Sequence, residues 1–218
     1  MQKLELIKRY VIFIVGLFVN SIGVALITKA DLGTSPISSI PYTLSLSFAP
    51  TIGQFTIIFS LLLIVIQICL ERRNYKPIQL LQIPVSVVFG YFIDFSMDYL
   101  LFWISPQNYV QSMIYLLIGC VVLGFGVYME VCANVVMLPG EGTVKSITRT
   151  FRTNFGTTKV CMDVTMAIGA LLISLLLTHQ VQGVREGTII AALLVGYISR
   201  FFGYLFKPIE RRILAEAY

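Results

Sequence analysis

Charged residues are scarce in this sequence of 218 residues. They make up 12% of it, whereas ordinary soluble domains contain about 25%. Hydrophobic residues account for 57%, and the mean hydropathy is +0.85. This balance excludes an ordinary soluble domain, and we predict one membrane domain over residues 1–218.

The residue patterns of common enzymes and metal sites are also missing. The sequence has one histidine, His179, and no HExxH, GxSxG, GxGxxG or Walker-type loop. Its four cysteines stand singly in apolar runs without CxxC spacing, which argues against a zinc site or a disulfide framework. They are Cys69, Cys120, Cys132 and Cys161. We therefore expect no catalytic residue, no metal and no cofactor.

The net charge of +5 comes from short basic clusters that separate apolar runs, not from one continuous basic face. Such clusters are typical determinants of membrane topology, so we expect a lipid bilayer and no nucleic acid as partner. The basic start is followed by an apolar run too long for a signal peptide, with no small-residue cleavage site. We interpret this run as an uncleaved first membrane helix.

Six apolar runs are long enough to cross a membrane as helices, which takes about 20 residues. They are Tyr10 to Thr28, Phe55 to Leu70, Leu80 to Trp103, Met113 to Val131, Lys159 to Thr178, and Thr188 to Leu205. Two further stretches, Ser35 to Phe48 and Pro139 to Phe151, have a helical pattern but are short and polar. They are expected to be re-entrant helices or short crossings.

The basic loops favour six crossings, because short loops rich in Lys and Arg stay in the cytoplasm. If the two short stretches do not cross, all four basic clusters lie on one side, and both termini are in the cytoplasm. The clusters are residues 1–9, 71–76, 149–159 and 207–212. An alternative with eight crossings would move residues 71–76 outside.

The two halves of the chain repeat each other at an offset of 103 positions. This offset pairs Gly16 with Gly119, Gly23 with Gly126, Ala30 with Ala133, Pro36 with Pro139, and Gly53 with Gly156. The pair Gly90-Tyr91 recurs as Gly196-Tyr197, a few positions out of this register. We expect one repeat over about 8–104, a second over about 111–206, and a cytoplasmic tail over 207–218.

Each repeat contains three full spans, so the second must enter the membrane from the opposite side. The predicted fold is therefore an all-α polytopic membrane protein of two inverted repeats, each with three transmembrane helices and one short Pro-initiated helix. Inverted repeats with interrupted segments are typical of secondary transporters, whose binding site lies between the repeats. The alternative is that the duplication only produced a stable bundle.

The segments ITKADLGTSPISSIPY, VVMLPGEGTVKSI and REGTIIAALLVGYISRFF resemble the YczE/YyaS/YitT family of bacterial integral membrane proteins, most closely its YczE-like branch. The resemblance covers nearly the whole chain. It implies a multi-pass protein of the cytoplasmic membrane, in a family for which transport is a common suggestion. Because the resemblance does not extend to the soluble C-terminal domain of YitT-type members, we do not expect a ligand-sensing domain.

The two Pro-centred motifs hold most of the candidate site residues. Non-helical backbone is tolerated at membrane depth only where protein or water covers it, so these motifs predict a cavity. Thr34 or Ser35 could cap a helix that starts near Pro36, and Glu141 would lie in the first turn of the second helix, as a proton or cation carrier. The candidate pathway residues are Asp31, Thr34, Ser35, Pro36, Ser38, Ser39, Asp94, Pro139, Gly140, Glu141, Gly142, Thr143 and Lys145. The alternative is that Asp31 and Glu141 only stabilise helix ends.

Other ionisable residues lie inside the spans, where charge is costly. Asp94 is expected near the membrane midplane, either in the pathway or as a lock between helices. Glu130, Asp163 and Arg200 fall toward the ends of their spans, where Arg200 could pair with either acid or snorkel.

The function predicted from these features is a small-solute transporter or permease with its pathway between the two repeats. It would work without ATP, since no nucleotide motif is present. The alternative is a non-transporting membrane partner or regulator, and an intramembrane enzyme has little support. The sequence leaves open the solute, the direction, the coupling ion and the oligomeric state.

Overall fold

The computed structural model describes residues 2–180 and 182–213, and this part of the chain forms helices and no strands. Six long helices are α1 (Gln2–Lys29), α3 (Ile52–Glu71), α4 (Gln82–Phe95), α5 (Tyr109–Ala133), α7 (Phe155–Thr178) and α8 (Glu186–Ile213). Each is long and apolar enough, alone or with the short turns that continue it, to cross a membrane. The predicted all-helical fold with six candidate spans is confirmed.

The two short helices also lie where the sequence placed them. They are α2 (Pro36–Ser47) and α6 (Pro139–Phe151), and each begins at its proline. A helix of 12 or 13 residues rises about 18–20 Å, which is less than the roughly 30 Å of a hydrocarbon core. Neither is long enough to be a full crossing. Three shorter turns are η1 (Arg72–Asn74), η2 (Pro77–Leu81) and η3 (Ser96–Leu100).

Local sequence signals explain where the helices begin and end. At the start of α3, the Thr51 hydroxyl accepts from the Gln54 amide and the Gln54 side chain accepts from the Thr51 amide, both at 3.1 Å. Left-handed residues end three helices: Asn134 after α5, Arg152 after α6 and His179 after α7. The tail expected after residue 206 is helical as far as Ile213, and residues 214–218 lie outside the described part.

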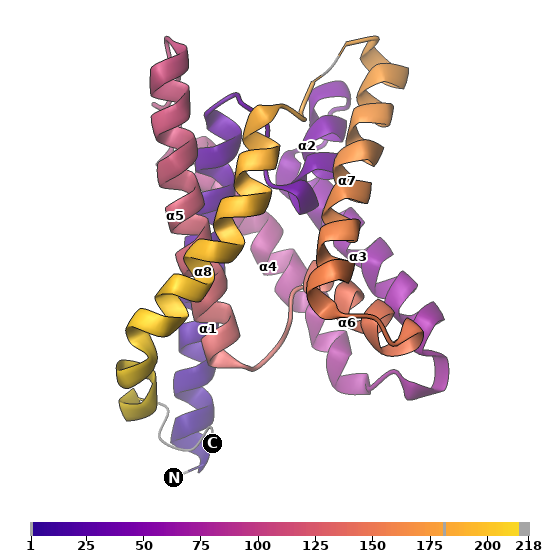
Figure 1. Ribbon diagram of the computed structural model, residues 1–218, viewed down its shortest axis with the longest axis vertical. Helices are drawn as coiled ribbons and strands as arrows, with labels where there is room; N and C mark the ends of the chain where they lie inside the picture. The colour runs from indigo at the N-terminus through magenta and orange to yellow at the C-terminus, as the bar shows by residue number, and fades with distance from the viewer. Residues whose placement is uncertain (1, 181, 214–218) are drawn as a thin grey trace.

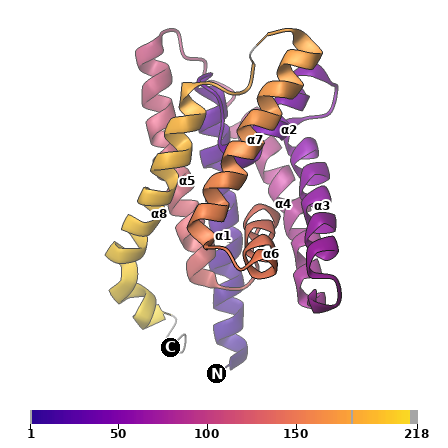
Figure 2. The same ribbon diagram turned by 45° about the vertical axis from the view of Figure 1, so that its right-hand side comes forward.

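The long helices run alternately up and down the bundle (Figures 1 and 2). Helix α1 begins and α8 ends at the same end, here called the terminal side, and the other end is the distal side. Helix α5 begins on the distal side, so the second half of the chain enters from the opposite end to the first. Each half follows the same order: long helix, short helix, long helix, long helix.

The most extensive packing in the bundle is between α1 and α5, and glycines make it possible. A Cβ atom added to Gly23 would lie 2.5 Å from the Leu123 Cα, and one added to Gly126 would lie 2.5 Å from the Asn20 backbone nitrogen. The two helix backbones therefore approach closely at both positions.

These α1–α5 contacts are reciprocal. Gly23 meets Leu123, and Gly126 meets Asn20. The 103-position offset pairs Gly23 with Gly126 and Asn20 with Leu123, so the same contact is made twice. The same holds further along, where Gly16 meets Met129 while Gly119 meets Leu26. Two elements related by a two-fold axis make reciprocal contacts of this kind.

The short helices pack across the two halves of the chain. Helix α2 packs against α7, and α6 packs against α3. On α2 the Ser39 hydroxyl donates to the Met166 carbonyl at 3.3 Å, and on α6 the Thr143 hydroxyl donates to the Leu63 carbonyl at 3.4 Å. The two accepting carbonyls are again 103 positions apart.

Candidate functional site

The first Pro-centred segment turns back into the bundle after α1, through two residues with positive φ. Asp31 has φ 57° and Gly33 has φ 105°. A Cβ on Gly33 would lie 2.4 Å from the Thr188 hydroxyl, so glycine is needed here for both conformation and space. The Asp31 side chain is exposed, and its backbone carbonyl accepts from the Arg185 guanidinium at 2.8 Å. The segment is thus tied to the start of α8.

Hydroxyl groups dominate the chain between this turn and α2. Thr34 is fully buried, with its amide donating to the Thr188 hydroxyl at 3.2 Å and its own hydroxyl 2.9 Å from that of Thr28. Ser35 holds the N-cap position of α2, but its side chain donates to the Ser38 hydroxyl at 3.0 Å and does not cap the helix. The Ser39 hydroxyl donates to the Pro36 carbonyl at 2.6 Å.

The second Pro-centred segment rises from the terminal side into the bundle before α6 begins at Pro139 (Figure 1). The Gly142 amide donates to the Leu138 carbonyl at 2.8 Å, and the Thr143 hydroxyl donates to the Pro139 carbonyl at the same distance. Pro139, Gly140, Gly142 and Thr143 are buried. The backbone of this first turn is therefore covered by protein.

The first turns of α2 and α6 meet although they come from opposite ends of the bundle. A Cβ on Gly140 would lie 2.8 Å from the Ile37 Cδ1, so the residues that follow the two prolines are in contact. Figure 1 shows α2 in the distal half and α6 in the terminal half. Of the predicted site residues, Pro36 and Pro139 with Gly140 are thus brought near each other, whereas Asp31 lies exposed beside the start of α8.

Three acidic residues gather near this meeting point. Glu130 is buried on α5, and its carboxylate accepts from the Asn20 side-chain amide at 2.7 Å. The Glu141 carboxylate is near enough to Glu130 to act on it electrostatically, and Lys159 and Asp163 act on Glu141 in turn. Lys159 and Asp163 are joined by an ion pair one helical turn apart on α7.

This arrangement differs from the pairing considered for Arg200. Asp163 binds Lys159, Glu130 binds Asn20, and Arg200 is exposed. From the sequence, Glu130 was considered only as a partner for Arg200, and Asn20 was not singled out. Asn20 is the one amide side chain in the long apolar run of α1 from Tyr10 to Thr28, which was the available signal.

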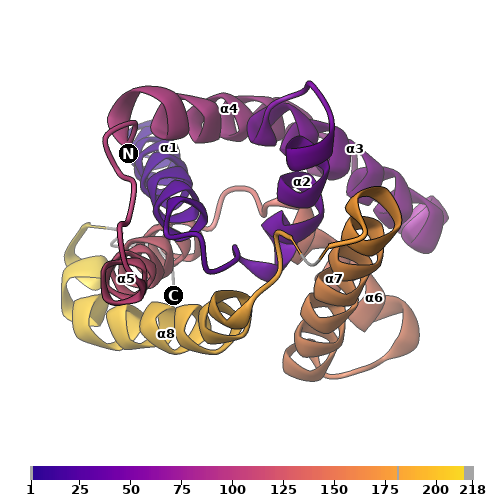
Figure 3. The same cartoon turned by 90° about the horizontal axis from the view of Figure 1, so that it is seen from above.

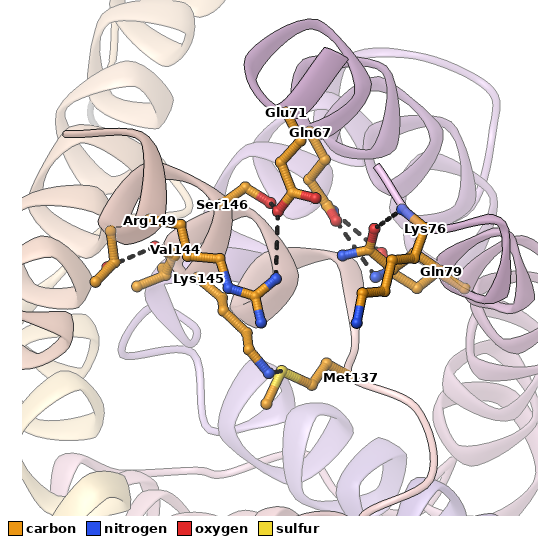
Figure 4. A network of polar contacts seen from close by, with 11 residues as sticks. Gln67, Glu71, Lys76, Gln79, Met137, Val144, Lys145, Ser146 and Arg149 are labelled. Carbon is orange, nitrogen blue, oxygen red and sulfur yellow. Dashed lines mark hydrogen bonds and ion pairs between the residues drawn. The ribbon is translucent and has the colours of Figure 1, made fainter. Parts of the chain in front are cut away.

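A buried amide pair fastens α6 to α3 and α4 (Figure 4). Gln67 is fully buried, and its side-chain nitrogen donates to the Gln82 oxygen at 3.0 Å, to the Pro139 carbonyl at 3.1 Å and to the Thr143 hydroxyl at 3.3 Å. Gly142 lies against both amides, because a Cβ there would be 2.9 Å from each. These two glutamines were not predicted as site residues, although both are isolated polar residues beside apolar runs.

Glu71 forms a second polar cluster at the terminal end of α3. Its carboxylate accepts from the Ser146 hydroxyl at 2.7 Å and lies 3.8 Å from the Arg149 guanidinium. Tyr75 lies in the loop beyond α3. Burial of the Tyr75 ring and the nearby Glu71 charge raise the pKa of Tyr75 above its ordinary value. Lys145 points toward the Met137 sulfur, 3.7 Å away, and takes no part in the Glu71 cluster (Figure 4).

Asp94 bonds to the first turn of α3. Its carboxylate accepts from the Thr51 hydroxyl at 2.6 Å and from the Gly53 amide at 2.8 Å. It therefore lies level with the distal end of α3 and not near the midplane, where it was expected from the sequence, and these contacts fit the role of a lock between helices. Within the described residues, no group of three His, Cys, Asp or Glu side chains is arranged to hold a metal ion.

Comparison with known proteins identifies relatives over nearly the whole chain. The model of a family of unknown function (DUF6198) matches residues 7–204. The uncharacterized membrane protein YczE of Bacillus subtilis is 30% identical over 201 residues, which is 92% of this chain and 87% of that protein. The uncharacterized protein YyaS of the same organism is 27% identical over 128 residues, 56% of this chain and 60% of that protein. No solved structure matches.

Proposed function

The chain belongs to the DUF6198 family of unknown function and is a membrane protein with six apolar helices, and from this premise we propose that it transports a small polar or ionic solute. The observation that carries the proposal is the contact between Ile37 and Gly140. It joins the first turns of two broken segments that come from opposite ends of the bundle. Secondary transporters place their binding sites where such half-helices meet.

The proposed pathway lies between two inverted repeats. The reciprocal α1–α5 contacts support this relation, because a 103-residue offset links both partners of each contact. The hydrogen bonds of Ser39 and Thr143 add support from the short helices, because their acceptors are 103 positions apart and their donors 104. With three long helices in each half, a two-fold axis in the membrane plane would relate the halves.

Glu141 is the proposed proton or cation carrier. It lies in the first turn of α6, next to Gly140 at the helix meeting point. Glu130 and Asp163 are the acids that interact electrostatically with Glu141, and Lys159, which is ion-paired with Asp163, is the basic residue that acts on it. A site in which acidic side chains outnumber basic ones favours a proton or a cationic solute over an anion. The Ser35, Ser38 and Ser39 hydroxyls would supply polar groups from the other motif.

In this proposal the terminal side faces the cytoplasm of a bacterial cell. The basic loop at residues 71–76 and the α6–α7 connection at 152–154 lie on that side, as the positive-inside rule requires (Figure 1). The three loops on the distal side would face outward.

Uptake into liposomes tests the proposal. The purified protein is reconstituted and offered pooled radiolabelled metabolites, followed by a single identified solute. We expect Glu141→Gln to lower the initial uptake rate at least about tenfold, whereas Asp98→Asn, which removes an exposed carboxylate, leaves it unchanged. If no solute enters through the folded protein, transport is refuted. If Glu141→Gln transports normally, the carrier assignment is refuted and the transport class stands.

One observation favours a non-transporting partner role as the second candidate. Only 6% of the most apolar 18-residue stretch of α8 is buried. Large side chains on this helix, such as Leu193, Tyr197 and Phe201, are exposed. Lipid would cover this face in a transporter, and another membrane protein would cover it in a partner. Stable co-purification of a second protein that requires these side chains would favour the partner role.

A further inference from the structure

The eight helices form two groups that are held together unequally. Helices α1, α4, α5 and α8 pack around the α1–α5 pair, and helices α2, α3, α6 and α7 pack around the two short helices. Each group contains matching helices from both halves of the chain. The long helices that join the groups are α3 with α4 in the first half and α7 with α8 in the second.

The first of these joints is closed. A Cβ on Gly53 of α3 would lie 2.1 Å from the Gly90 carbonyl of α4, so the two backbones touch. Asp94 reinforces this contact through its bonds to Thr51 and Gly53, and the Gln67–Gln82 pair links the terminal ends of the same two helices. We call the Thr51–Gly53–Gly90–Asp94 contact the distal latch.

The matching joint in the second half is open. In the repeat, Gly53 corresponds to Gly156 on α7, and Gly90 corresponds to Gly196 on α8 through the shared Gly-Tyr pair, three positions out of the 103-residue register. Among the described residues, no heavy atom of a neighbouring element lies within 4 Å of a Cβ built on Gly196, and Gly156 meets only its own capping residue. The views in Figures 1 and 3 show α7 and α8 standing apart.

Burial of the helices shows the same asymmetry. In the most apolar 18-residue stretch of each span, 39% is buried in α3 and 33% in α4, compared with 17% in α7 and 6% in α8. Gly196 thus presents a small residue with no partner at the position where its counterpart Gly90 is tightly packed. Other contacts recur in both halves, including those of Ser39 and Thr143, and the two halves differ most clearly at the joints between the groups.

We propose that the protein has a second conformation in which α8 packs against α7 through Gly196 and Gly156, while the distal latch between α3 and α4 opens. This inference rests on the inverted-repeat relation of the proposed function. The conformation with the first joint closed and the conformation with the second joint closed can have similar free energies, because glycines allow close helix packing at both joints. The structure described is then the conformation with the first joint closed and the second open.

Disulfide trapping in membranes tests this conformation. In a variant with the four native cysteines replaced by alanine, cysteines are introduced as Gly156→Cys with Gly196→Cys. The matched control is Gly156→Cys with Tyr197→Cys, since position 197 is exposed and turned about 100° away on the helix. We expect mild oxidation to cross-link the first pair at least about tenfold faster than the control. Equal rates, or no cross-link, would overturn the proposal.

A second variant tests whether the two joints are coupled. Asp94→Asn weakens the distal latch, so it should favour the second conformation and raise the 156–196 cross-linking rate about tenfold. Asp98→Asn, four residues further along and exposed, should leave the rate unchanged. If Asp94→Asn gives a folded protein with an unchanged or lower rate, the coupling is wrong.

Cross-linking and uptake can fail separately. Cross-linking at 156–196 without uptake of any solute would keep the two conformations and refute transport. Uptake with cross-linking no faster than the control would keep transport and refute this conformation.

Discussion

Replacement of Gly23 by alanine tests the close approach of α1 and α5. The added Cβ would lie 2.5 Å from both the Cα and the backbone nitrogen of Leu123, where contact normally requires about 3.5–4 Å. The obstructing atoms are backbone, so relief requires the two helices to separate by about 1 Å along their most extensive contact. Overpacking of this kind costs about 3 kcal/mol, and the better helix propensity of alanine returns at most about 1 kcal/mol.

The expected net loss is therefore about 2 kcal/mol in the free energy of unfolding. It can be measured by SDS titration in mixed micelles, with helix content followed by circular dichroism. Gly196→Ala is the matched control, because its Cβ meets open space, and it should be neutral or stabilising by up to about 1 kcal/mol. Gly126→Ala should match Gly23→Ala, because its Cβ would lie 2.5 Å from Asn20 in the reciprocal contact. Equal stability of the Gly23→Ala and Gly196→Ala variants would refute this reasoning.

Three further predictions follow from the polar clusters and the topology. Gln67→Leu removes three donated hydrogen bonds and should lower the free energy of unfolding by about 1–3 kcal/mol, whereas exposed Gln107→Leu should change it by less than about 0.5 kcal/mol in the same titration. Arg149→Gln breaks an ion pair with Glu71 in which the arginine side chain is half exposed. The same titration should show a loss below about 1 kcal/mol in the free energy of unfolding, and a larger loss would show that this ion pair is not weak. In whole cells, an impermeant maleimide should label a cysteine at position 107 and not one at position 154, and the reverse pattern would invert the proposed orientation.

The broken segments could be predicted because proline and glycine act locally. Pro36 and Pro139 fix the first residue of α2 and α6 whatever packs around them, so both helices begin where the sequence placed them. The six long helices could also be predicted, since length and apolarity alone define a candidate span. Their ends moved by several residues, as at Thr51, where a capping box starts α3 earlier than the apolar run.

The polar partnerships could not be predicted, because they depend on which helices touch. Gln67 and Gln82 belong to different helices, and only the packing of α3 against α4 makes them a pair. Asp94 lies near the end of α4, and its depth in the membrane follows from the position of the first turn of α3, to which it is hydrogen-bonded. The open joint between α7 and α8 has no sequence signal, since Gly90 and Gly196 occur in the same Gly-Tyr pair.

Disulfide trapping between the first turns of the two short helices tests the central claim most directly. In the cysteine-free protein, Ile37→Cys with Gly140→Cys should form a disulfide readily in membranes, because these positions touch at the meeting point. Ile37→Cys with Thr150→Cys, at the exposed far end of α6, should not form one. Absence of the 37–140 disulfide in a folded protein would show that the two broken segments do not meet, and the proposed pathway would lose its basis.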